Sequence, residues 1–166
     1  MIRNVVRAVT TLLAVLAVPA AMFVAPLPAS AANFDTSIRE TFGHRWCIGS
    51  DTTDLFAAVV ERSCPGRKWD EISLGSSQWL IELHSDTSKC IAANNSGAKV
   101  VLHPCSGGFG VVWIRETSSS GHDLWHNRAT DLYLSGPNGS NPGGQFFLDV
   151  RNGTSGELQQ FDNVPG

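Results

Sequence analysis

Four cysteines are the residues of this chain with the clearest chemistry. Cysteines either pair as disulfides in an oxidising compartment or hold a zinc ion as thiolates. Tetrahedral zinc sites favour closely spaced ligands, and the sequence contains no Cys-x-x-Cys. The cysteines lie at Cys47, Cys64, Cys90 and Cys105. Their spacing favours two disulfides, and four cysteines leave three possible connectivities.

The other reactive residue types do not form a catalytic constellation. His122 and His126 stand four apart, which on a strand would separate them by about 13 Å, too far for one metal ion. Adjacent carboxylates such as Asp70 and Glu71 point to opposite sides of a strand, so they cannot face one substrate as an acid/base pair must. Catalytic motifs such as Gly-x-Ser-x-Gly and His-Glu-x-x-His are absent from the sequence. We therefore expect a protein that is not an enzyme and that uses neither metal nor cofactor.

Residues 1–31 have the pattern of a secretory signal peptide. Two arginines precede an apolar run at 11–18, and Ala29-Ser30-Ala31 is the small-residue pattern that a signal peptidase cleaves. We expect cleavage after residue 31 or 32, which leaves a single domain over 32–166 in a secreted, extracellular protein. Export also favours disulfides, because they persist in oxidising compartments.

The charge of the exported chain excludes two classes of partner. The full sequence holds 12 Lys and Arg against 15 Asp and Glu, a net charge of -3. Removing the leader takes away two arginines and no acidic residue, so the mature net charge is 10 minus 15, or -5. No run of basic residues remains, so we expect no nucleic-acid partner and no membrane insertion.

The rest of the chain repeats itself with a period of about 40 residues. The interval from Cys47 to Cys90 is 43 residues, and the interval from Trp69 to Trp113 is 44. A third unit follows without cysteines and ends at Phe161, in the tryptophan position. Pairing the first cysteine with the second, and the third with the fourth, keeps each disulfide inside one repeat. We favour that connectivity.

The local signals within each repeat are those of strands and turns. Segments such as 79–83, 100–102 and 146–150 are short, rich in β-branched or aromatic residues, and bounded by Gly, Asn, Ser or Pro. No stretch of helical length after the leader carries a 3.6-residue apolar stripe. The predicted fold is all-β, with three roughly 40-residue repeats of four strands each. Units of this size cannot each bury a hydrophobic face alone, so they must share one core.

Each repeat opens on a cysteine-hydrophobic pair or its counterpart and closes on an aromatic residue. The opening and closing segments are Trp46-Cys47-Ile48-Gly49 with Lys68-Trp69, Lys89-Cys90-Ile91-Ala92 with Val112-Trp113, and Asp131-Leu132-Tyr133-Leu134 with Gln159-Gln160-Phe161. This arrangement resembles the ricin B-chain-like β-trefoil lectin family, whose repeats carry Cys-hydrophobic-Asp, a second cysteine and Gln-x-Trp. The resemblance runs from Ile38 to Val164 and implies a single β-trefoil domain.

The resemblance also implies where a sugar would bind. In the family, an acidic residue two positions after the first cysteine accepts hydrogen bonds from sugar hydroxyls. An aromatic ring near the second cysteine stacks on the sugar, and the closing glutamine completes the site. Here the acidic position holds Gly49, Ala92 and Leu134, the aromatic position holds Arg62, His103 and, nearby, Leu148, and the glutamine position holds Arg67, Val111 and Gln159. The sites are therefore divergent, and only Gln159 matches the family.

Polar and aromatic residues near these positions could rebuild a sugar site. The candidate contacts are Asn94, His103, Asn138, Phe147 and Gln159. The second repeat supplies the first two of them, and the third repeat supplies the others. In the first repeat, Asp51 and Asp54 follow the glycine, and we interpret them as turn residues.

We therefore expect a secreted, non-catalytic, lectin-like module that binds carbohydrate. Its expected partner is a glycan, a polysaccharide or a protein of the cell surface. The alternative is a protein-interaction or inhibitor module that uses the trefoil as a scaffold and has lost sugar binding, because a fold does not determine its function.

Overall fold

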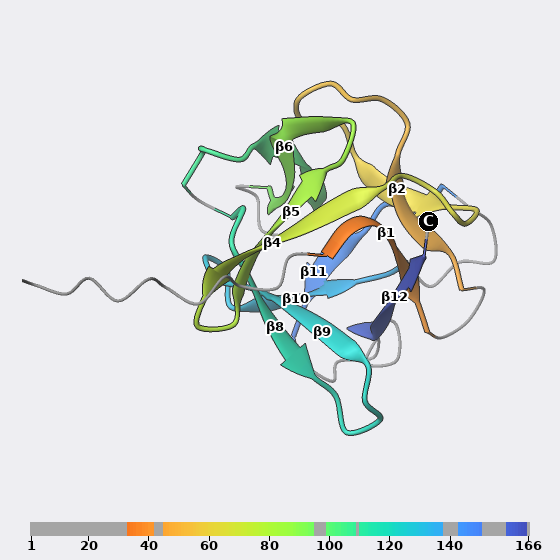
Figure 1. Ribbon diagram of the computed structural model, residues 1–166, viewed down its shortest axis with the longest axis vertical. Helices are drawn as coiled ribbons and strands as arrows, with labels where there is room; N and C mark the ends of the chain where they lie inside the picture. Colours follow the sequence, from red (N-terminus) through yellow and green to blue (C-terminus); the bar gives the residue numbers. More distant parts are fainter. Residues whose placement is uncertain are drawn as a thin grey trace, which may run out of the picture.

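The computed structural model describes residues 33–41, 45–94, 99–108, 110–137, 143–150 and 159–165. The predicted leader lies outside these residues. Within them, no helix has the length and hydrophobicity that crossing a membrane requires. The described residues form a 12-stranded sheet, which confirms the predicted all-β fold (Figure 1).

The strands fall into three groups of four, one for each repeat. The first group is β1 (Asn33–Glu40), β2 (Cys47–Ser50), β3 (Val59–Arg62) and β4 (Trp69–Gly75). The second group is β5 (Gln78–Leu83), β6 (Asp86–Ala93), β7 (Val100–Pro104) and β8 (Trp113–Thr117). The third group is β9 (Asp123–Asn127), β10 (Leu132–Ser135), β11 (Phe147–Asp149) and β12 (Phe161–Pro165).

Six of the strands close into a barrel. Antiparallel pairing runs from β1 to β4, β5, β8, β9 and β12, and returns to β1. Figure 1 shows the last strand, in dark blue, beside the first, in orange. The ring therefore has no unpaired edge. The hairpins β2–β3, β6–β7 and β10–β11 are linked to one another by isolated bridges, so they gather into a single cap.

The closing aromatic residues of the three repeats lie in one shared core. Trp69, Trp113 and Phe161 are fully buried. The indole Nε1 of Trp69 donates a hydrogen bond to the Ile48 carbonyl at 3.1 Å, and that of Trp113 donates to the Ile91 carbonyl at 2.9 Å. Each indole therefore links the end of its own repeat to the strand that carries the first cysteine of that same repeat.

The strand register corrects the predicted alignment of the third repeat by one residue. Equivalent cross-strand pairs are Cys47 with Arg62, Cys90 with His103, and Tyr133 with Asp149. Tyr133, and not Leu132, therefore occupies the cysteine position. Leu134 lies in the hydrophobic core, so the predicted placement of Leu134 in the acidic position is wrong and Ser135 lies there. Successive residues of a strand face opposite sides, and the fully buried core position determines which alignment is correct.

Both predicted disulfides are present, and a tyrosine replaces the third. Cys47 pairs with Cys64, and Cys90 pairs with Cys105. By the chain-entropy model, each loop contributes about 3 kcal/mol to stability. Tyr133 stacks on the ring of His126, with centroids 4.7 Å apart, and its hydroxyl donates to the Glu116 carboxylate at 3.0 Å. Stacking and a hydrogen bond thus hold the strand that a disulfide holds in the other repeats.

Three polar side chains meet where the repeats converge. Glu71, Arg115 and Asn163 each lie two residues past the closing aromatic residue of their repeat. Glu71 Oε2 accepts hydrogen bonds from Arg115 Nη1 at 3.3 Å and from Asn163 Nδ2 at 2.9 Å, and its side chain is fully buried. Arg115 Nη2 also donates to Asp123 at 2.5 Å. A polar network around the buried Glu71 carboxylate therefore joins all three repeats.

Candidate functional site

The sugar position of the second repeat is filled by apolar side chains. Ala92, which occupies the acidic position, packs with Val111 in a small hydrophobic cluster. The ring of His103 contacts Phe56 edge to face at 5.5 Å, and a Cβ at Gly107 would lie 2.5 Å from that ring. Local packing therefore holds the imidazole.

The two candidate contacts of the second repeat lie far apart. His103 is opposite Cys90, near one end of the β6–β7 hairpin. The backbone amide of Asn94 donates to the carbonyl of Lys99 at 2.8 Å, at the other end. Four positions along a strand correspond to about 13 Å. The structure therefore does not bring Asn94 and His103 together.

At the sugar position of the third repeat, the side chain of Gln159 is hydrogen-bonded within the protein. The amide of Gln159 is buried and donates hydrogen bonds to Ser135 Oγ and to the Val150 carbonyl, both at 2.9 Å. Phe147 is half-buried on β11, directly opposite Ser135. Asn138 lies outside the described residues. Gln159 matches the family, but here its amide holds the protein's own chain.

We expect the substitution Gln159→Ala to lower stability and to leave ligand binding intact. Removing the amide leaves Ser135 Oγ and the Val150 carbonyl without their buried donor, which costs about 1 to 3 kcal/mol in the free energy of unfolding. Urea denaturation measures this loss, and glycan binding by the folded variant measures the second effect. Gln160→Ala is the matched control, because its side chain bonds only the exposed Ser120 in the described residues. Intact stability with weakened binding would contradict the structural role.

The first repeat keeps an open hollow at its sugar position. A hollow of about 470 Å³ is lined by Ser50, Arg62, Ser63, Gly66 and Arg67. Two of these, the arginines, occupy the aromatic and glutamine positions of the family. The acidic position holds Gly49, which has no side chain. A Cβ at this position would lie 2.6 Å from Arg62 Cγ, so the glycine leaves space for the Arg62 side chain.

Both arginines of this hollow are anchored to the backbone. Arg62 Nη1 donates to the Glu61 carbonyl at 2.8 Å, and its Nη2 pairs with Asp51, whose side chain is 68% exposed. Asp51 therefore holds the arginine and is more than a turn residue. Arg67 Nε donates to the Ser50 carbonyl at 3.1 Å. Arg67 forms no ion pair with any residue that the structure describes.

A second hollow adjoins the first and has a counterpart in the next repeat. It measures about 220 Å³ and is lined by Gly66, Arg67, Lys68, His84 and Ser85. The counterpart measures about 330 Å³ and is lined by Gly108, Gly110, Val112, Arg128 and Ala129. The bond from His84 N to the Lys68 carbonyl is repeated from Arg128 N to the Val112 carbonyl, both at 3.0 Å. The two hollows are therefore equivalent, but Val111 replaces Arg67 at the glutamine position of the second.

A pair of buried carboxyl groups lies in the core of the first repeat. Glu61 is opposite Ile48, where the other repeats have leucines, and its carboxyl hydrogen-bonds to that of Glu40. Burial, then the charge of Glu61 and this hydrogen bond, raise the pKa of Glu40 to about 9. Burial raises the pKa of Glu61 to about 7, although the hydrogen bond from Glu40 lowers it. Glu40 also leaves no room for a Cβ at Gly136, so the third repeat packs directly on the pair.

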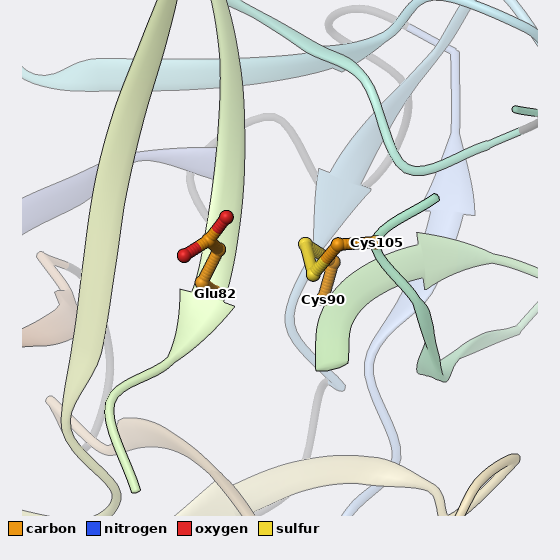
Figure 2. A group of neighbouring side chains, drawn as sticks. All are labelled: Glu82, Cys90 and Cys105. Carbon is orange, nitrogen blue, oxygen red and sulfur yellow. A yellow bond between two sulfur atoms is a disulfide. The ribbon is translucent and has the colours of Figure 1, made fainter. Parts of the chain in front are cut away.

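One group of side chains has the spacing of metal ligands but not their chemistry. Figure 2 shows Glu82 on one strand and the Cys90–Cys105 disulfide beside it. The carboxylate oxygen and the two sulfurs lie within 4.8 Å of one another. Metals bind cysteine as the thiolate, and both sulfurs here are consumed by the disulfide. A single carboxylate remains, and burial, then the charge of Asp70, raises its pKa. This group does not form a metal site.

Comparisons with known proteins identify the fold. No protein-family model and no curated protein matched the sequence. Among solved structures, the chain is similar to the designed three-fold symmetric protein ThreeFoil, with a TM-score of 0.71 and 19% identity over 79% of this chain and 98% of that one. It is also similar to the Haemophilus ducreyi cytolethal distending toxin, with a TM-score of 0.63 and 12% identity over 77% of this chain and 83% of that one.

A lectin is also among the similar structures. The Polyporus squamosus lectin, solved with the epitope Neu5Aca2-6Galb1-4GlcNAc, aligns with a TM-score of 0.59 and 13% identity. The alignment covers 77% of this chain but spans only 47% of the lectin chain. A mosquitocidal holotoxin aligns with a TM-score of 0.68 over only 17% of its length. At these identities the comparisons establish a β-trefoil fold, and the predicted fold is confirmed.

Proposed function

We propose that this chain is a secreted, non-catalytic carbohydrate-binding module whose binding site lies in the first repeat. One observation carries the proposal. The sugar position of the first repeat is an open hollow, whereas Ala92 and Val111 pack in a buried apolar cluster at the second position and Gln159 is hydrogen-bonded to Ser135 at the third. The β-trefoil fold, shared with a lectin, supports the proposal at the level of the scaffold.

The hollow offers the two kinds of contact that a sugar needs. A sugar presents hydroxyl groups together with an apolar C–H face. Guanidinium groups and the exposed Ser63 hydroxyl supply donors, and the methylene stem of Arg62 supplies apolar surface beside Gly49. The site thus replaces the acceptor carboxylate of the family with donors.

Filling the hollow is expected to abolish most of the binding. The exposed Ser63 lines the hollow, so Ser63→Met should occlude it with little effect on stability. We expect glycan binding by the secreted, oxidised chain to weaken about tenfold or more on a glycan array, a loss of about 1.4 kcal/mol or more.

The control places the same side chain in the hollow of the second repeat that Gly108, Gly110, Val112, Arg128 and Ala129 line. Ala129 is exposed and lines that hollow, so Ala129→Met should leave binding unchanged. Loss of binding in Ala129→Met, with Ser63→Met intact, would move the site to the second repeat. Absence of binding to every glycan by the wild-type chain would contradict the proposed function.

Protein interaction is the second candidate function, and two exposed apolar side chains favour it. Leu55 and Phe56 are adjacent between β2 and β3, with exposed fractions of 45% and 66%. Exposed apolar surface of this kind is typical of interaction sites. A wild-type chain that binds cells treated to remove their glycans, and loses that binding in Leu55→Ser/Phe56→Ser, would favour this candidate over carbohydrate binding.

A further inference from the structure

We infer that the ligand of the first-repeat hollow carries an oxyanion, a carboxylate or a sulfate group, which the guanidinium of Arg67 binds. This inference rests on the proposed carbohydrate-binding function and names the chemical class of the glycan. Its basis is the replacement of two family positions by arginine beside the open hollow of the first repeat.

The donor set of the hollow requires a ligand rich in acceptors. An arginine side chain has five N–H donors and no acceptor, whereas the family's carboxylate has acceptors only. The acidic position here is Gly49, so no side chain can accept a bond from a sugar hydroxyl at that position. A planar guanidinium matches the geometry of a carboxylate or sulfate and binds it through two parallel bonds.

Arg67 is held ready for such a ligand. Its Nε is anchored to the Ser50 carbonyl at 3.1 Å, and the side chain lines the hollow. Among the described residues no carboxylate pairs with it, whereas Arg62 is paired with Asp51 and Lys68 with Asp35 at 3.4 Å. Among the described residues, Arg67 is therefore a cation of this surface that has no carboxylate partner.

The second hollow extends the surface beyond one sugar ring. Gly66 and Arg67 line both hollows, so the arginine lies between them. The second hollow adds Lys68 and His84, the latter bonded to Asp70 at 2.8 Å. A glycan chain that crosses both hollows would pass over Arg67. An anionic substituent on that part of the glycan would then lie next to the guanidinium.

The second repeat does not have the two arginines that line the hollow of the first repeat. Its equivalent residues at the two arginine positions are His103 and Val111. The arginine of its hollow, Arg128, is exposed and donates to Gln78 at 3.0 Å. The mature chain is expected to carry a net charge of -5, which disfavours nonspecific attraction of polyanions. Binding of an anionic glycan would therefore require a local site.

The test compares polymers that differ in their anionic group. The probes are dextran, which is neutral, dextran sulfate, which carries sulfate, and hyaluronan, which carries carboxylate. We expect the secreted, oxidised chain to bind one or both anionic polymers and not dextran at 0.15 M salt, and the positive arm identifies the group. Arg67→Gln should weaken that binding about tenfold or more. Arg128→Gln, the matched control in the counterpart hollow of the second repeat, should leave it unchanged.

Three results would overturn the inference or separate it from the proposed function. Wild-type affinity in Arg67→Gln, or an equal loss in Arg128→Gln, would overturn the anion site. Binding of neutral glycans that is lost in Ser63→Met but retained in Arg67→Gln would overturn it and leave the carbohydrate-binding function standing. Equal affinity for dextran sulfate and for polyvinyl sulfonate, which contains no sugar, would support the anion site and overturn the carbohydrate-binding function.

Discussion

Replacing both buried carboxyls, in Glu40→Gln/Glu61→Gln, is expected to stabilise the protein strongly at pH 8 and to flatten the pH dependence of its stability. In the unfolded chain both groups ionise near 4.5, whereas in the folded chain the pKa values are raised to about 9 and about 7. The folded state therefore holds protons that the unfolded state has lost. The stabilising contribution of the pair is complete below about pH 4.5 and is lost as pH rises toward 9.

The magnitude of this effect exceeds that of ordinary surface changes. A pKa difference of one unit corresponds to about 1.4 kcal/mol, and both groups have raised pKa values, so we expect a gain of several kcal/mol at pH 8. Urea denaturation of wild type and double variant between pH 5 and 9 measures the gain and the slope. Asp54→Asn, at an exposed turn, is the control and should leave the slope unchanged. A double variant that keeps the wild-type slope would show that the pair does not titrate as inferred.

Removing the Arg115 guanidinium is expected to destabilise the fold strongly. Arg115→Met would leave the fully buried Glu71 carboxylate without its cation, and breaking a buried pair in this way costs about 3 to 5 kcal/mol. Burial opposes the charge of Arg115, but the hydrogen bond and charge of Asp123, with the charge of Glu71, outweigh it, so its pKa is raised. Thermal and urea unfolding measure the loss.

A second substitution distinguishes the buried charge from lost packing. Arg115→Met/Glu71→Leu removes both charges and should recover a large part of the stability, because an apolar pair avoids the cost of a lone buried carboxylate. Arg128→Met, at an exposed arginine, is the control and should change stability by about 0.5 kcal/mol or less. A double variant as unstable as Arg115→Met alone would show that packing, and not charge, causes the loss.

The sequence predicted the fold because its markers are long-range and regular. Two cysteine loops and the spacing of Trp69, Trp113 and Phe161 defined three repeats, and the structure confirms both disulfides and the shared core. The third repeat has no cysteine to fix its alignment. Leu132 and Leu134 are both apolar, so only packing against the core shows that Tyr133 takes the cysteine position.

The site was harder to predict because it depends on which side chain fills which space. Gly49 was interpreted as the loss of an acceptor, whereas in the structure it makes room for Arg62 beside an open hollow. Gln159 matched the family, but its amide faces Ser135 inside the protein. The sequence did carry one signal that was missed. Glu61 stands where the second repeat has Leu102, and a charged residue in a core position marks an unusual environment.

The polar network of Glu71, Arg115 and Asn163 limits how this chain can be rebuilt from copies of one repeat. A trefoil made of three identical copies of the first repeat would bring three glutamates together at one point, where no cation could pair with them. Copies of the second repeat would gather three arginines in the same way. At this point the three repeats are therefore not interchangeable, because one supplies an anion, one a cation and one an amide.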